Sequence, residues 1–152
     1  MAARSPTDRC RGTTLLEVLT ATAIMVTLLG IGIPQMTRLR APYALASASR
    51  QIATDFQTAR MRAIARNTRY RVTFNPTATT YTLEREATPN NFIADGGTQT
   101  LPAGATVTAP APANPIFDTR GMLGSDVSVS VSVPGSGTKT VTVNVLGRTT
   151  IS

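Results

Sequence analysis

Residues 12–33 read GTTLLEVLTATAIMVTLLGIGI, and this stretch decides how the rest of the chain is interpreted. From residue 13 onward it holds 21 residues and one charged side chain, Glu17. A helix of that length rises about 30 Å, which is the thickness of the hydrocarbon core of a bilayer. A helix in a soluble core would carry a polar face, whereas this one offers only threonines and glycines. The sequence therefore predicts a membrane-spanning helix.

Glu17 is the unusual residue of this helix. A carboxylate inside a bilayer costs about 3 kcal/mol and persists where it has a partner. Cleavage of the chain after Gly12 would create one, because Thr13 would then carry a free α-ammonium group one helical turn before Glu17. The pair could form within one chain or between neighbouring helices. The second arrangement would make Glu17 an assembly residue.

The residues before the proposed cut form a short basic leader. It contains Arg4, Arg9 and Arg11, and positive charge favours a cytoplasmic location. The leader also contains Cys10, the one cysteine of the chain. A secretory signal peptide is the alternative, but its cleavage site follows the apolar stretch, and no such site lies there in this sequence.

A second, amphipathic helix is expected from Tyr43 to about Asn67, after Pro34 and Pro42, which we expect to kink or interrupt the first. Apolar residues recur in it at spacings of three and four. They are Leu45, Ala48, Ile52, Phe56, Ala59 and Ala63. This stripe should pack on a folded domain.

After residue 69 the apolar residues alternate, which predicts β-strands. Strands are expected in residues 70–74, 79–86, 104–108, 115–118, 127–133 and 139–146, with a long loop over 87–100 and a turn at 134–137. VSVSVSV (127–133) and KTVTVNVL (139–146) form the strongest hairpin signal, and their valines should face the helix.

The expected fold class is α+β, with a long N-terminal helix, half in the membrane and half amphipathic, packed on antiparallel β-sheets. The parts are a leader (1–12), a transmembrane and assembly helix (13–34), an amphipathic helix (35–68) and a β-domain (69–152).

The composition argues against an enzyme. The chain has no histidine, and a cut after Gly12 would leave it without a thiol, so the usual metal ligands and general bases are missing. The acids are few and scattered. Glu84 and Glu86 flank Arg85 and are interpreted as a solvated edge. We expect no catalytic residue, metal or cofactor.

The net charge is +7, and fourteen of the fifteen basic residues are arginine. Arg62, Arg66 and Arg69 follow one another at helical spacing and would share one face if the helix extends that far. Two interpretations remain open: a stripe that binds nucleic acid, or a solvated face whose cations favour the C-terminal end of the helix.

The sequence resembles type IV pilins and the pseudopilins of type II secretion. GTTLLE (12–17) is similar to their cleavage motif, although Thr13 stands where phenylalanine is usual. FDTRG (117–121), Gly147-Arg148 and the segment 45–74 are similar to the GspH/FimT group of minor pseudopilins and minor pilins. The resemblance implies a pilin-like fold over nearly the whole chain.

It also implies how such a chain is processed and used. A prepilin peptidase would cut after Gly12 and methylate Thr13, and an assembly platform in the inner membrane would add the subunit to a filament. The chain would be a minor pseudopilin of a type II secretion system, anchored in the inner membrane among lipid and other pseudopilins or pilins, with its C-terminal domain in the periplasm.

The alternative is a minor type IV pilin that binds DNA in natural transformation. Arginines do this in FimT-like proteins, some of them in a terminal Gly-Arg-x-Arg. Residues 147–150 read GRTT and keep only the first of these two arginines. The candidate anion- and DNA-binding residues are Arg62, Arg66, Arg69 and Arg148.

Overall fold

The computed structural model describes residues 14–75, 79–108 and 110–152, with residues 31–39 described by their backbone alone. The predicted leader and cleavage site, including Cys10, Gly12 and Thr13, lie outside these residues. The chain divides into two compact units, Met1–Arg38 and Leu39–Ser152. The helix α1 (Leu15–Arg66) has residues in both units.

The predicted interruption of the helix at Pro34 or Pro42 is wrong, because both lie inside α1, whereas a kink at either proline stays a prediction. Each proline removes a single backbone donor. The turns on either side keep their own hydrogen bonds, so the backbone remains helical. The predicted end of the second helix, near Asn67, is confirmed to within one residue, since α1 ends at Arg66.

In the first unit, α1 begins with a capping residue. The hydroxyl of Thr14 accepts a hydrogen bond from the backbone N–H of Glu17 at 3.2 Å, as expected of an N-cap three residues before a glutamate. Further along, the hydroxyls of Thr20, Thr22 and Thr27 donate to backbone carbonyls of the preceding turn. Within the part of the chain that the structure describes, no helix is both long enough and apolar enough to cross a membrane.

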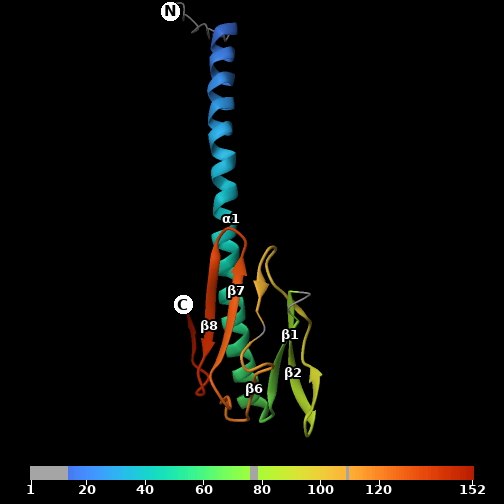
Figure 1. The fold of residues 1–152 in the computed structure, drawn as a ribbon. Helices are drawn as coiled ribbons and strands as arrows, with labels where there is room; N and C mark the ends of the chain where they lie inside the picture. The colour runs from blue at the N-terminus through green and yellow to red at the C-terminus, as the bar shows by residue number, and fades with distance from the viewer. Residues whose placement is uncertain (1–13, 76–78, 109) are drawn as a thin grey trace, which may run out of the picture. The chain divides into compact units, whose positions relative to one another are not determined.

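The second unit contains two antiparallel sheets (Figure 1). The first sheet has the order β3-β2-β1-β6, and β4 also pairs with β2. Its strands are β1 (Tyr70–Asn75), β2 (Thr80–Thr88), β3 (Asn91–Ala94), β4 (Gln99–Thr100) and β6 (Ile116–Phe117). The second sheet has the order β5-β7-β8-β9. Its strands are β5 (Thr106–Val107), β7 (Val127–Val133), β8 (Gly137–Val143) and β9 (Thr149–Ile151).

Every predicted strand is found, but the predicted long loop over 87–100 is wrong, because it contains β3 and β4. These strands are short, and both pair with β2 along the edge opposite to β1. β9 was not predicted at all. Its three residues carry too little pattern, and its pairing with β8 comes from the chain returning after the turn at Gly147.

Both sheets bury one face against the same stripe of α1. The six predicted stripe residues are all below 5% exposed, which confirms the prediction. The valines of β7 and β8 predicted to face the helix are also buried, and they belong to one core cluster with Tyr70, Val72 and Phe117 of the first sheet. The fold is α+β, a helix packed on antiparallel sheets.

All buried apolar side chains of the described residues lie between Leu45 and Val143. The unit Leu39–Ser152 therefore contains a complete core of its own. A fragment of residues 39–152 is suitable for measurements of folding stability.

Phe56 lies at the centre of this core, with its ring centroid 6.0 Å from that of Phe74 and 6.3 Å from that of Phe117. We expect Phe56→Ala to lower the free energy of unfolding of residues 39–152 by about 3–5 kcal/mol, measured by urea denaturation. Tyr43→Ala, at a position on the same helix that is 73% exposed, is the matched control and should cost less than about 0.5 kcal/mol. Equal costs would contradict the assignment of Phe56 to the core.

Candidate interaction site

Asp95 engages two of the arginines that the sequence places on a helical stripe. Its carboxylate lies 3.2 Å from the Nη1 atom of Arg62 and 2.8 Å from that of Arg66. The hydroxyl of Tyr70 donates to the same carboxylate at 2.7 Å. Asp95 directly follows β3, so this cluster ties the loop after β3 to the last turns of α1.

Arg69 lies beyond the end of α1 and does not share a helical face with Arg62 and Arg66. Its guanidinium forms an ion pair with Glu86 and donates to the side chain of Asn90 at 3.0 Å. In the same sheet, Arg71 pairs with Glu84 at 2.6 Å. The interpretation of Glu84 and Glu86 as a solvated edge is therefore wrong, because β2 lies inside the sheet, where each acid faces an arginine.

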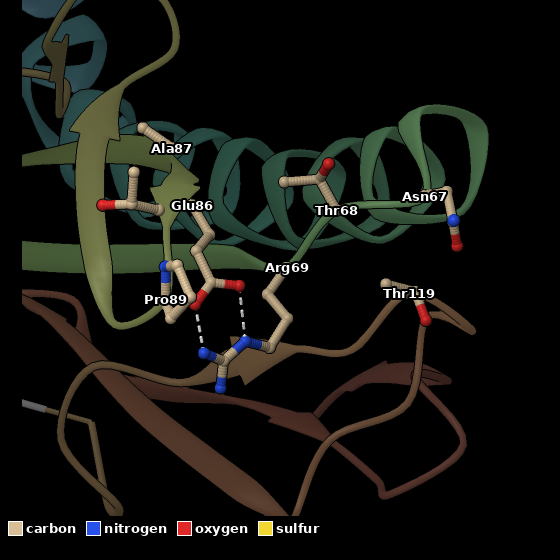
Figure 2. Close-up of a pocket in the computed structure, with 8 residues that line it drawn as sticks. Asn67, Thr68, Arg69, Glu86, Ala87, Pro89 and Thr119 are labelled. Carbon is tan, nitrogen blue, oxygen red and sulfur yellow. Dashed lines mark hydrogen bonds and ion pairs between the residues drawn. The ribbon is translucent and has the colours of Figure 1, made fainter.

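Arg69 and Glu86 also line an open pocket of about 290 Å³. Figure 2 shows their two side chains bonded to each other between the end of α1 and the turn after β2. The full lining is Asn67, Thr68, Arg69, Glu86, Ala87, Thr88, Pro89 and Thr119. Since its two charged side chains, Arg69 and Glu86, pair with each other, the lining of the pocket has no net charge. No group of three or more acidic, cysteine or histidine side chains suited to a metal ion occurs among the described residues.

These ion pairs keep the acids charged. The hydrogen bond from Arg69, together with the backbone N–H of Asn90, lowers the pKa of Glu86 to about 2. Burial by itself would raise the pKa of Asp95, but the hydrogen bonds from Tyr70 and Arg66 and the nearby positive charges outweigh it, so the pKa is lowered. Neither Asp95 nor Glu86 is available to protonate a substrate near neutral pH.

Arg148, the remaining candidate, differs from the other three. Its side chain is exposed and, within the described ranges, forms no ion pair. Its backbone N–H donates to the side chain of Asn144 at 2.8 Å, which closes the turn between β8 and β9. The prediction that the four arginines bind an anion or DNA stays a prediction, but three of them are engaged inside the domain.

Gly121 and Gly147 bring two turns against α1 at the same place. A Cβ atom on Gly121 would lie 2.7 Å from the Cδ1 atom of Ile64, and one on Gly147 would lie 2.6 Å from the Cδ atom of Arg60 and 2.7 Å from the carbonyl oxygen of Gly121. Both glycines also have positive φ, 77° and 75°, a conformation that side chains disfavour. We call Gly121, Gly147 and Arg60 the glycine clamp.

Hydrogen bonds hold the clamp together. The Nε atom of Arg60 donates to the carbonyl oxygen of Gly121 at 3.2 Å. The side-chain amide of Gln57 donates to the carbonyl oxygen of Gly147 at 3.2 Å and to the hydroxyl of Thr149 at 2.7 Å. Phe117, at the start of the FDTRG motif, is fully buried. The two C-terminal motifs therefore meet at one point on the helix.

Sequence reasoning missed Arg60, Gln57 and Asp95. The two glycine motifs were a signal that the backbone makes close approaches after β6 and β8, but nothing local indicates that both approaches meet Arg60. Asp95 directly precedes Gly96 and Gly97, and a segment of this composition is typical of an ordinary loop.

The family model described as type II transport protein GspH matches residues 48–147. The chain belongs to the GspH family. The match includes residues 48–66 of α1, both sheets apart from β9, and the glycine clamp. A comparison with curated proteins gives no match.

Solved structures share the GspH fold of this chain at low identity. The minor pseudopilin EpsH from the type 2 secretion system of Vibrio cholerae is 12% identical, with a TM-score of 0.59 over 71% of this chain and 95% of that one. The type IV minor pilin FimU of Pseudomonas aeruginosa is 14% identical, with a TM-score of 0.59 over 71% of this chain and 87% of that one. This likeness concerns the fold alone.

The clamp predicts that Gly147 tolerates no side chain. Gly147→Ala should destabilise residues 39–152 by about 1–3 kcal/mol more than Gly135→Ala, because overpacking adds to the cost of a positive φ. Gly135 is the matched control, since its φ is +81° and nothing lies within 4 Å of a Cβ placed there. Arg60→Ala in the Gly147→Ala background should recover part of the difference in urea denaturation. Equal losses at the two glycines would contradict the clamp.

Acidic pH should lower the folding stability of the domain. The pKa of Glu86 in the folded domain lies below its ordinary value of 4.5, so the ionised carboxylate stabilises the fold above about that pH, and this stabilisation is lost as the pH falls toward 2. Asp95, whose pKa is also lowered, acts in the same direction. The free energy of unfolding should therefore drop between about pH 5 and pH 2, and less steeply in the Glu86→Gln variant. A variant with the full acid slope would contradict the prediction.

Proposed function

We propose that this chain is a minor pseudopilin, a structural subunit of a type II secretion filament. The observation that carries the proposal is the GspH match over residues 48–147, on a fold that the minor pseudopilin EpsH shares. The family is one of structural subunits, which assemble with other pilin-like subunits. The paired acids Glu84, Glu86 and Asp95 fit such a role.

We also propose that the N-terminal part of α1 anchors the subunit in the inner membrane and enters the filament. Its sequence supports this, with one charge in residues 13–33. The internally bonded hydroxyls of Thr20, Thr22 and Thr27 add support. A hydroxyl that donates to its own helix exposes no unpaired donor to lipid.

Glu17 has two candidate roles in this segment. It lies in the first turn of α1, where a carboxylate is stabilised by the helix dipole. Its side chain is exposed and forms no ion pair with any described residue, so it is free to pair with the amine that cleavage would create at Thr13. We propose that Glu17 pairs with the amine of Thr13, either in the same chain or in a neighbouring subunit.

Cleavage after Gly12 is tested by Gly12→Glu. The variant should accumulate as a larger, membrane-bound species, since a peptidase that reads the small residue at this position would not accept a charged side chain. The size of the product is read on immunoblots of membranes and confirmed by N-terminal sequencing. A product of normal size would remove the cleavage proposal.

The assembly role of Glu17 is tested by Glu17→Gln, which keeps the size and helix-forming tendency of the side chain and removes its charge. We expect normal cleavage and a reduced amount of the subunit in sheared filaments. Thr22→Val, a neutral change on the same helix, is the control and should assemble normally. Normal incorporation of Glu17→Gln would leave Glu17 with a helix-capping role alone.

The alternative proposal is a minor type IV pilin, and the likeness to FimU supports it to the same degree. Gene neighbours separate the two. A secretin, a secretion ATPase and other pseudopilin genes beside this one favour secretion, whereas retraction and competence genes favour a pilus.

A further inference from the structure

Three large apolar side chains are exposed around the glycine clamp. Met61 and Ile64 lie on α1 and are 61% and 50% exposed, and Leu146, in the turn after β8, is 62% exposed. Met61 follows Arg60 directly and Leu146 directly precedes Gly147, while Ile64 lies against Gly121. Met61 and Ile64 are three residues apart on α1 and so share a face of the helix. The close contacts of Gly121 and Gly147 bring the turn that holds Leu146 to the same part of α1, and Figure 1 shows the turn after β8 at the same end of this unit as the C-terminal end of α1. The three apolar side chains and the clamp are therefore treated as one surface. We call it the clamp surface.

The clamp surface also carries positive charge that nothing within the domain neutralises. Among the described residues, neither Arg60 nor Arg148 forms an ion pair. Arg120 contacts Asp118 at 3.3 Å, but its side chain is 81% exposed, so this pair is weak. By contrast, Arg62 and Arg66 are engaged by Asp95. Two arginines without an ion pair, Arg60 and Arg148, therefore lie beside the exposed apolar side chains, while Arg40, Arg50 and Arg85, also without one, lie elsewhere.

We propose that the clamp surface docks a segment of a neighbouring filament subunit that presents carboxylates beside apolar side chains. This inference rests on the proposed function and names the partner chemistry of the subunit. Methionine and arginine are enriched in protein interfaces, and the fully buried centre of an interface is more apolar than the rest of the surface. Carboxylates of the partner would pair with Arg60 and Arg148, and its apolar side chains would cover Met61, Ile64 and Leu146.

A nucleic acid fits this surface less well. Phosphate groups would pair with the arginines, but a phosphate backbone gains nothing from exposed methionine, isoleucine and leucine side chains. The apolar residues therefore favour a protein segment. The clamp also supports such a role because its close contacts hold both turns against the helix, so the surface is preorganised for binding.

The test uses the full chain in cells that assemble the filament. A photo-crosslinking amino acid replaces Met61 in one strain and Thr138 in a control strain, since Thr138 is exposed on β8 away from the clamp. We expect position 61, and not 138, to crosslink to another filament subunit through a peptide that contains aspartate or glutamate. Arg148→Glu should lower the crosslink yield about fivefold, and changing the partner acid to arginine should restore it.

The outcomes separate this inference from the proposed function. If the subunit is present in sheared filaments but position 61 gives no crosslink, or if Arg148→Glu leaves the yield unchanged, the clamp surface is not a docking site and the proposed function stands. If the subunit is absent from filaments, both fail. If Arg148→Glu and Ile64→Glu abolish binding of a purified DNA fragment yet leave the crosslinks unchanged, the surface serves nucleic acid, and the inference is overturned.

Discussion

The structure depends on burying one stripe of α1 beneath two sheets. Ala48, Ala59 and Ala63 are fully buried, and their small side chains let the strands approach the helix closely, while Phe56 packs against Phe74 and Phe117 of the first sheet. Neither sheet has a second layer of its own, so each needs the helix to cover its apolar face. The helix in turn has no other cover for its stripe. This mutual requirement explains why the core lies wholly within Leu39–Ser152.

The same packing sets the distribution of charge. Strand pairing places Glu84 opposite Arg71, Glu86 forms an ion pair with Arg69 just before β1, and the loop after β3 returns Asp95 to the end of α1. These contacts pair Arg62, Arg66 and Arg69 with acids, although in the sequence these arginines form the most prominent run of positive charge. Arg148, in the turn after β8, and Arg60 beside it form no ion pair with any described residue. The same holds for Arg40, Arg50, Arg85 and Lys139, which lie elsewhere on the domain.

The glycine clamp explains why two short motifs far apart in the sequence characterise this fold. Both glycines lack room for a side chain because both turns contact the same part of α1, and Phe117 anchors the first of them in the core. A secretion pseudopilin and a pilus subunit share the fold at 12% and 14% identity with this chain. The fold is therefore common to a secretion subunit and a pilus subunit.

The sequence by itself determined the elements whose pattern is local. The apolar stretch with its single acid, the helical spacing from Leu45 to Ala63 and the alternating valines of β7 and β8 all follow periodicities that neighbouring residues reveal. Only the tertiary structure decided that α1 continues past Pro34 and Pro42, that residues 87–100 add two strands, and that Arg62, Arg66 and Arg69 are engaged while Arg148 is free. Those outcomes depend on which distant backbone or carboxylate lies opposite a residue, and strand register and loop return, rather than local pattern, set that arrangement.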